Sequence, residues 1–350
     1  MFVQAMKTRA KSAVAQLCHA SGIGLRVSRG KVAILAYHRV VTPEHLQRHY
    51  IEPGMYVLQD VFEMQVRWLI NHYNVISFSE LLDKWHTGTW DPKQAYCVLT
   101  FDDGWLDNYQ YAFPVLRDYK VPATIFLPTS FVGSSSWFWA DHLTYLLSRL
   151  SRPNVTPMHR SRVAHVIADF PGSGQENRAR REIDLSQESF ADIIARCKCL
   201  KPGEIDAVLK TLGDILEVPI PRERLTVNWE EVREMAMHGI SFGSHSCSHH
   251  LLTQLSHPEA RREIEESDRV LRAMPGGYLP VFCYPNGDHN ETIQQIVQEC
   301  NYAAAVSTQT GLEVAQPDNR FSLKRIGIHN DVSSTVSMFA FHLFRAALRV

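Results

Sequence analysis

The strand-like run at residues 98–105 constrains the fold more than any other stretch, because it ends in two adjacent carboxylates and a glycine. Its sequence is Val-Leu-Thr-Phe-Asp-Asp-Gly-Trp, with Asp102 and Asp103 where the apolar run stops. In α/β proteins the carboxyl ends of the strands carry the chemistry. A turn there can aim both carboxylates into one cleft, where one binds a metal and the other moves a proton. A turn in which both carboxylates are solvated or cap the next helix explains the same residues equally well.

Strand-like and helix-like segments alternate along most of the chain. Apolar residues at helical spacing separate short β-rich runs, as at positions 62, 66, 69, 70 and 73. Cap signals mark helix starts at Ser79, Asn228 and Asn290, and at Ser256, where Glu259 completes a capping box. This rhythm is typical of a parallel sheet, open or closed into a barrel. The expected strands lie at 32–38, 74–78, 96–101, 121–127, 240–243, 281–285, 302–306 and 325–329.

The alternation is interrupted between residues 137 and 225, where the sequence predicts a mainly helical insertion. Five segments follow from this interruption. They are a basic N-terminal leader at 1–31, expected to be helical, the first part of the core domain at 32–136, the insertion at 137–225, the second part of the core domain at 226–332, and an amphipathic C-terminal helix at 333–350.

The composition excludes several classes of protein. Because 36 basic residues balance 37 acidic ones, no global field attracts nucleic acid, and a hydrophobic content of 45% is sufficient for a packed core. The seven cysteines are scattered and odd in number, which favours a reducing compartment over a disulfide framework. No apolar run is long enough to cross a membrane and the leader is a poor signal peptide, so we expect a cytoplasmic protein. The sequence carries no signal for an oligomeric state.

The two terminal segments leave a second interpretation of the location open. The leader is basic and contains no acidic residue before Glu44, and the segment 338–349 is amphipathic. Helices that are frayed or packed on the core explain both features. A weak, peripheral association with an anionic membrane surface explains them as well.

His245 and His249 follow the expected strand at 240–243 with a spacing of four, which places both imidazoles on one side of a helical turn or compact loop. In a chain with 17 histidines, a hydrogen-bonded surface pair produces this spacing by chance. Two histidines and one carboxylate of the Asp pair nevertheless make a three-ligand set that leaves positions open for water and substrate, as in hydrolytic metal sites. Cys247 and His250 are rival ligands, and a cysteine would favour a closed, structural site.

These motifs resemble those of a known family. Thr-Phe-Asp-Asp-Gly at 100–104 and His-Ser-Cys-Ser-His at 245–249 are similar to the first two signature motifs of the polysaccharide deacetylase family, the fourth carbohydrate esterase family with its NodB homology domain. Tyr-His-Arg-Val at 37–40 and the turn at 282–287 resemble the branch that acts on exported or lipid-linked sugars. The implied fold is α/β, an irregular (β/α) barrel of the polysaccharide deacetylase type with a helical insertion.

The resemblance also implies a mechanism. Asp103, His245 and His249 would hold a divalent metal, with zinc as the expected ion, while Asp102 would be the general base. His329 would be the acid that protonates the departing amine, and the products would be acetate and a free amino sugar. The resemblance also implies that the backbone N–H at Asn286 would stabilise the oxyanion. Tyr284 and His38 would lie with it on the side of the site that contacts the oxyanion and the substrate.

Two features of the family have no counterpart in this chain. Much of the family has an arginine in the third motif that orients the base, whereas the matching position here is Cys283, so either another group holds Asp102 or the base is less well tuned. The family's Asp-x-x-Asp-Trp motif is also missing. His38 either lies near the site or is an ordinary hydrogen-bonded histidine at a strand end.

Three functions compete at this point. The first is a metal-dependent hydrolase that removes N-acetyl groups from a polysaccharide, an oligosaccharide or a glycolipid precursor. The second is a catalytically decayed, carbohydrate-binding member of the same fold, which the missing arginine favours. The third is a non-haem iron oxygenase built on two histidines and one carboxylate, which would leave Asp102 unused. We favour the first, because the Asp pair and the His pair are both intact.

Overall fold

The computed structural model describes residues 13–17, 19–48, 51–52, 54–152, 155–168, 190–198, 200–219 and 222–349. The chain divides into two compact units. The first comprises residues 1–45, 53–134 and 225–350, and the second comprises 46–52 and 135–224.

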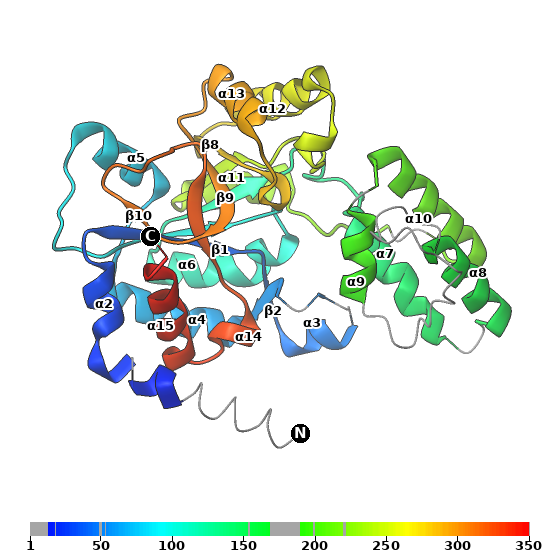
Figure 1. Ribbon diagram of the computed structural model, residues 1–350, viewed down its shortest axis with the longest axis horizontal. Coiled ribbons are helices and arrows are strands. Elements are labelled where there is room, and N and C mark those ends of the chain that lie inside the picture. Colours follow the sequence, from blue (N-terminus) through cyan, green and yellow to red (C-terminus); the bar gives the residue numbers. More distant parts are fainter. Residues whose placement is uncertain are drawn as a thin grey trace, which may run out of the picture. The chain divides into compact units, whose positions relative to one another are not determined.

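The first unit is built on a closed barrel of seven parallel strands (Figure 1). The barrel closes because the first of these strands pairs with both the second and the last, with Ile34 opposite Val98 on one side and Leu35 opposite Ile326 on the other. This confirms the α/β barrel expected from the sequence. Around the barrel the strands are β1 (Lys31–Tyr37), β5 (Tyr96–Phe101), β6 (Ala123–Leu127), β7 (Ile240–Ser244), β8 (Tyr278–Cys283), β9 (Ala304–Thr310) and β11 (Leu323–Gly327).

Short strands extend the barrel at its margins. The strand β10 (Glu313–Val314) pairs antiparallel with β1, and β4 (Asn74–Val75) pairs parallel with β5. A separate two-stranded parallel sheet is formed by β2 (Arg39–Val41) and β3 (Tyr56–Leu58). The strand expected at 74–78 is therefore only two residues long, because a helix already begins at Phe78.

Helices follow the strands, as the alternation predicted. The expected caps at Asn228, Ser256 and Asn290 are present, but Ser77 rather than Ser79 accepts the hydrogen bond from the first turn of its helix, at Glu80 N. In and beside this unit the helices are α2 (Ile23–Ser28), α3 (Pro43–Arg48), α4 (Gln59–His72), α5 (Phe78–Thr87), α6 (Phe113–Tyr119), α11 (Trp229–Met237), α12 (His257–Arg272), α13 (Glu291–Glu299), α14 (Asn330–Ser333) and α15 (Val336–Ala347), with 3₁₀ turns at Leu252–Gln254 and Pro285–Gly287.

The helix after the Asp pair contains a widened turn. A π-helical segment, Asn108–Ala112, leads directly into α6, and the N–H of Phe113 bonds to the carbonyl of Asn108, five residues earlier. The sequence indicated an interruption at Pro114, which has no N–H to donate. The chain accommodates the proline with this π turn and continues as a helix, an insertion that is frequent at functional sites.

Side chains of the barrel strands are buried on both faces, and successive residues belong to different apolar clusters. Val32 and Ile34 of β1 belong to one apolar cluster with Val98 of β5, whereas Ala33 and Leu35 belong to another. Successive side chains on a strand point to opposite faces, so one cluster lies inside the barrel and the other beneath the surrounding helices.

The second unit is helical in its described residues and has its own apolar core, which includes Leu146, Val163, Ile194 and Leu212. Its helices are α7 (Trp139–Ser148), α8 (Pro157–Ala168), α9 (Phe190–Cys197) and α10 (Pro202–Leu216), with a 3₁₀ turn at Arg149–Ser151. In the described parts of both units, no helix is long and apolar enough to cross a bilayer.

Candidate active site

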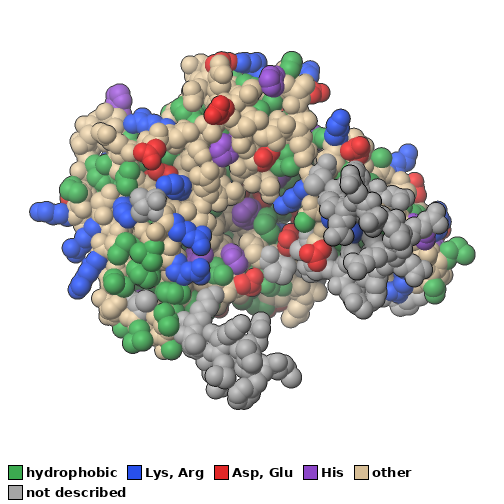
Figure 2. Space-filling model, in the orientation of Figure 1, with side chains coloured by type: hydrophobic (Ala, Val, Ile, Leu, Met, Phe, Trp, Pro, Cys, Tyr) green, Lys and Arg blue, Asp and Glu red, His purple; other side chains and the backbone are tan. Residues whose placement is uncertain are grey.

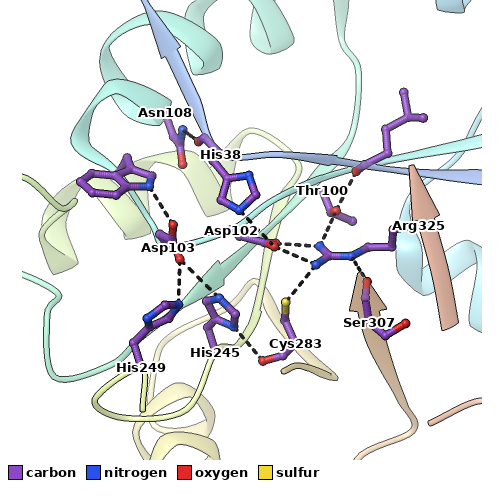
Figure 3. A network of polar contacts seen from close by, with 12 residues as sticks. His38, Thr100, Asp102, Asp103, Asn108, His245, His249, Cys283, Ser307 and Arg325 are labelled. Carbon is purple, nitrogen blue, oxygen red and sulfur yellow. Dashed lines mark hydrogen bonds and ion pairs between the residues drawn. The ribbon is translucent and has the colours of Figure 1, made fainter. Parts of the chain in front are cut away.

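Polar side chains gather at one end of the barrel, where the strands reach their carboxyl ends (Figure 3). His38 directly follows β1, Asp102 and Asp103 follow β5, and His245 follows β7. Because all seven strands are parallel, these strand ends share one rim. The structure thus brings the two sequence motifs together.

The turn after β5 points the second carboxylate away from the path of the strand. Asp103 has a φ of 72°, in the left-handed region that few residues other than glycine adopt, and Gly104 follows with a φ of 60°. A Cβ atom on Gly104 would lie 2.5 Å from Cδ2 of Leu127, so this position requires glycine for space as well as for conformation. Backbone strain of this kind is typical of functional sites.

The loop that carries the histidines is also strained and held from several sides. Ser246 and His249 have φ values of 63° and 58°, and the Ser246 hydroxyl accepts a hydrogen bond from the His249 N–H at 3.0 Å. A carboxylate oxygen of Glu263 on α12 accepts hydrogen bonds from the N–H groups of Cys247 and Ser248, at 2.9 and 2.8 Å. These contacts fix the loop independently of any ligand.

Asp103, His245 and His249 form a compact donor cluster. Oδ1 of Asp103 lies 3.3 Å from Nε2 of His245 and 3.2 Å from Nε2 of His249. Nδ1 of His245 lies 2.7 Å from the carbonyl oxygen of Cys283, and a carbonyl can only accept, so the proton of the neutral ring is on Nδ1. Nε2 then meets the Asp103 carboxylate either through a bound cation or, without one, through a proton on a positively charged ring. Metal-binding histidines are commonly oriented by this type of backbone hydrogen bond.

The residues present therefore fit a divalent metal. One carboxylate oxygen and two imidazole nitrogens are a ligand set used in hydrolytic zinc sites, with coordination positions left for water and substrate. Burial raises the pKa of the Asp103 carboxyl, but hydrogen bonds from His245 and His249 outweigh this effect and hold that pKa well below its usual range. Asp103 is therefore anionic and ready to act as a ligand.

The other oxygen of Asp103 is held by a neighbouring tryptophan. The indole N–H of Trp105 donates to Oδ2 of Asp103 at 3.0 Å, so that Oδ1 faces the histidines. The guanidinium of Arg39 lies 4.3 Å from the centre of the Trp105 ring and donates to Asp107 at 2.7 Å. Asp107, at the start of the π-helical turn, also accepts from the Val40 N–H. This stack fixes the orientation of the expected metal ligand.

Asp102, the expected base, pairs with an arginine from β11, which is separated from β5 only by β1. Both carboxylate oxygens of Asp102 accept hydrogen bonds of 2.7 Å from the two terminal nitrogens of Arg325 on β11 (Figure 3). Arg325 is 2% exposed, and its remaining N–H groups donate to the Ser307 carbonyl, the Thr100 hydroxyl and the Cys283 sulfur. Burial raises the pKa of Asp102, but the charge and hydrogen bonds of Arg325 outweigh it and lower that pKa.

Arg325 was missed in the sequence, where Cys283 occupies the position of the family's arginine. The structure shows that another strand supplies the guanidinium that holds Asp102. The sequence held one signal for this role. Arg325 is two residues from Leu323 on β11, so both side chains are on the same face of the strand, and Leu323 belongs to the apolar cluster that contains Val32 and Ile34. A charged side chain in phase with a barrel interior needs a buried partner of opposite charge.

A second donor group, formed by Asp102, His245 and Cys283, also has metal-ligand spacing. Arg325 already donates to Asp102 and to the Cys283 sulfur, so a metal ion there would face a guanidinium. The thiol of Cys283 is buried and its pKa is raised, mainly by that burial, which disfavours the thiolate that a metal requires. We therefore assign the expected metal to the Asp103 cluster.

His38 lies beside the base. Its Nε2 is 3.9 Å from Oδ2 of Asp102, and its side chain is 28% exposed, in contrast to the 4% of Asp102. Nδ2 of Asn108, in the π-helical turn, donates to the His38 carbonyl at 2.8 Å. Of the two alternatives for His38, the structure supports a position at the site.

The other three predicted residues lie differently. Nδ1 of His329 is 3.5 Å from Asp331, and no contact among the described residues joins its ring to the Asp pair. Asn286 is exposed after β8, with a φ of 56°, and its role at an oxyanion stays a prediction. The side chain of Tyr284 is fully buried, with its hydroxyl donating to the Phe321 carbonyl, so the expected substrate contact by this side chain is wrong: it packs in the core.

Comparison with known proteins agrees with the site. A sequence model described as polysaccharide deacetylase matches residues 90–305, which contain the Asp pair and both histidines. The chain belongs to the polysaccharide deacetylase family.

The relatives of this chain are distant. YxkH of Bacillus subtilis, assigned to the polysaccharide deacetylases, is 22% identical over 306 residues, which cover 87% of this chain and 74% of YxkH. A poly-β-1,6-N-acetyl-D-glucosamine N-deacetylase of Staphylococcus aureus is 28% identical over 156 residues, which cover 39% of this chain and 52% of that enzyme. The alignment thus spans about half of the staphylococcal protein.

Solved structures share the fold. The deacetylase PplD of Streptococcus pyogenes, in complex with acetate, superposes with a TM-score of 0.56 at 20% identity, covering 91% of this chain and 98% of PplD. A de-N-acetylase of Aggregatibacter actinomycetemcomitans gives 0.54 at 15% identity, covering 89% and 99%. The deacetylase barrel is therefore shared over nearly the whole of these proteins.

Proposed function

We propose that this protein is a metal-dependent hydrolase that removes acetyl groups from the N-acetylated sugars of a polysaccharide, an oligosaccharide or a glycolipid precursor. The observation that carries the proposal is the pair of adjacent carboxylates with different partners. Asp103 faces two imidazoles, and Asp102 faces a guanidinium. Membership of the family and the name of the staphylococcal relative support N-acetylated sugar as the substrate class.

Asp103, His245 and His249 would hold the metal. A divalent cation bound by these groups lowers the pKa of water and polarises an amide carbonyl. Asp102 stays ionised because of Arg325, and it accepts a proton from the attacking water. Arg325 fixes the plane of this carboxylate with two parallel hydrogen bonds, so the proton acceptor is oriented before the substrate arrives.

His38 is our candidate for the group that protonates the leaving amine, in place of His329. Its ring faces Asp102 on one side and is partly open to solvent on the other. A protonated imidazole in that position can reach both a substrate nitrogen and the base that collects the proton. In the described residues, His329 is instead paired with Asp331.

The test is acetate release from a panel of N-acetylhexosamine oligomers, with chelator-stripped protein before and after zinc is added. We expect activity only with zinc, and we expect Asp102→Asn to bind zinc without turnover. Arg325 would lose its partner in that variant, so Asp102→Asn/Arg325→Met serves as the uncharged counterpart with the same expected result. Release of acetate that does not need metal would contradict the mechanism.

The structure and the same assay also bear on the two rival functions, the decayed carbohydrate-binding protein and the oxygenase. Arg325 takes over the task of the missing arginine, which removes the sequence argument for a decayed binding protein. If no acetate is released and zinc does not bind, the result would favour the catalytically decayed, carbohydrate-binding protein. An oxygenase needs an oxidant, so zinc-dependent turnover under argon excludes it.

A further inference from the structure

One face of the first unit combines exposed apolar side chains with unpaired arginines. It is formed by residues 13–17, 19–29 and 336–349, which include α2 and α15, and we call it the terminal face. Figure 2 shows hydrophobic side chains gathered over α2 and α15, with Lys and Arg side chains on both sides of them. The large apolar side chains exposed on these segments are Val14 at 47%, Leu17 at 71%, Ile23 at 43% and Leu348 at 62%.

The helices α2 and α15 are packed together at this face. A Cβ atom on Gly24 would lie 3.3 Å from Cβ of Phe344, so the missing side chain lets α2 approach α15 closely. The Lys31 ammonium donates to the Ala347 carbonyl at the end of α15. A shallow pocket between residues 13–17 and α15 is lined by Ala15, Val332, Met338, Phe341, His342 and Arg345.

The charge of the terminal face has one sign. The sequence contains no Asp or Glu before Glu44 or after Asp331. Arg26, Arg29, Arg345 and Arg349 are exposed, and among the described residues none of them forms an ion pair. This is unusual in a chain whose 36 basic and 37 acidic residues balance overall. An apolar patch beside arginines without acidic partners is complementary to a surface that has negative charges on the outside and apolar groups beneath them.

We propose that the terminal face docks on the surface of an anionic lipid bilayer. The apolar side chains enter the boundary between headgroups and acyl chains, and the arginines bind lipid phosphates. In this proposal the chain lies on the surface of the bilayer. This location goes beyond the proposed hydrolysis and does not depend on it, although it would suit a lipid-linked or nascent membrane-bound sugar.

The test is flotation of the full-length protein with vesicles of phosphatidylcholine alone or with about 30% phosphatidylglycerol. We expect binding to the anionic vesicles that weakens with salt. One variant carries Arg→Gln changes at 26, 29, 345 and 349. Since each basic residue at such a surface contributes about fivefold to partitioning, this variant should bind at least about 100-fold more weakly.

A matched control separates this face from net charge. It carries four Gln substitutions at exposed basic residues elsewhere, Lys210, Arg222, Arg233 and Arg262, and it has the same net charge. We expect it to bind like the unmodified protein. Equal binding by both variants would overturn the proposal, and so would unmodified protein that stays at the bottom of the gradient.

The apolar part has its own variant, Leu17→Ser/Leu348→Ser, in which both changes are at exposed positions. We expect weaker flotation with zinc binding and acetate release from soluble oligomers unchanged. A second copy of the chain is the competing occupant of the face. The proposal would be wrong if the unmodified protein is a dimer by size, if this variant is a monomer and if neither floats with vesicles. The terminal face would then be a dimer interface.

Discussion

Asp102 and Asp103 are neighbours in sequence and both are at most 5% exposed, yet their surroundings differ in one decisive respect. Asp102 is paired with a guanidinium, which carries a permanent charge and is itself buried. Asp103 faces two imidazoles, which are neutral ligands when unprotonated, and an indole N–H. The first carboxylate is therefore paired with a permanent positive charge of the protein, whereas the second faces imidazoles that can hold either a proton or a metal ion. That difference supports the proposed roles of Asp102 as the base and Asp103 as the metal ligand.

The largest effect is expected from removing the permanent charge. Arg325→Met leaves Asp102 as an unpaired buried carboxylate, which should cost about 3–5 kcal/mol of unfolding free energy. Burial then raises the pKa of Asp102 against only the weaker effects of His38 and His245, so the fall in activity on the acid side should move to higher pH. Urea unfolding and a pH–rate profile measure these two effects. In Asp102→Asn/Arg325→Met, which buries no charge, most of the stability should return; a single variant as stable as the unmodified protein would show that the pair is not buried in solution.

The next effect concerns the histidine beside Asp102. His38→Gln should lower turnover by about 10²–10⁴-fold, because that is the usual contribution of a positioned proton donor. His329→Gln serves as the control and should change turnover much less. Steady-state rates with zinc-loaded protein compare the two. The reverse order would restore His329 as the acid, as the family resemblance implied.

On the side of Asp103, substitution should act on metal binding before it acts on anything else. Asp103→Asn is expected to weaken zinc affinity by more than the roughly 10–100-fold that loss of an outer hydrogen-bond partner costs. The double variant Asp102→Asn/Arg325→Met should keep zinc affinity, because neither residue belongs to the Asp103 cluster. Titration calorimetry with zinc alone gives both values. If both variants lose zinc equally, the metal bridges the two carboxylates and the proposed division of roles is wrong.

The sequence predicted one carboxylate environment better than the other for a physical reason. The ligands of the Asp103 cluster lie in two short motifs, and each motif carries its own turn, so local patterns were sufficient to find them. The partner of Asp102 lies 223 residues away on another strand, and only closure of the barrel brings it near. Spacing along a chain cannot show such a contact. The alternation of Leu323 and Arg325 on β11 marked Arg325 as inward-facing, but not which carboxylate it would meet.

The fold followed from local patterns, but the positions of the remaining site residues depended on contacts between distant segments. The alternation of apolar strands and helices, several of them with recognisable caps, predicted a parallel sheet, and the family resemblance implied that it closes into a barrel. Tyr284 was misplaced because a tyrosine next to a strand end looks the same in sequence whether it faces solvent or the core. Burial among Phe282, Tyr302 and neighbouring apolar residues decided it, and that packing comes from segments far apart in the chain.

The smallest effect is expected at Trp105, which connects the Asp103 cluster to the π-helical turn. Trp105→Phe removes the N–H that holds Oδ2 of Asp103 and keeps an aromatic ring beneath the Arg39 guanidinium. Zinc affinity should fall by about 10–100-fold, the usual cost of losing an outer partner of a metal ligand. Trp90→Phe is the control, since its indole N–H donates at 3.1 Å to the carbonyl of Gly30, which precedes the amino end of β1, whereas the donor cluster lies at the carboxyl ends of the strands. Both variants should lose a similar amount of stability, but only Trp105→Phe should lose zinc affinity. Equal zinc affinities would show that the histidines alone orient Asp103, and that the difference between the two carboxylates does not extend beyond their direct partners.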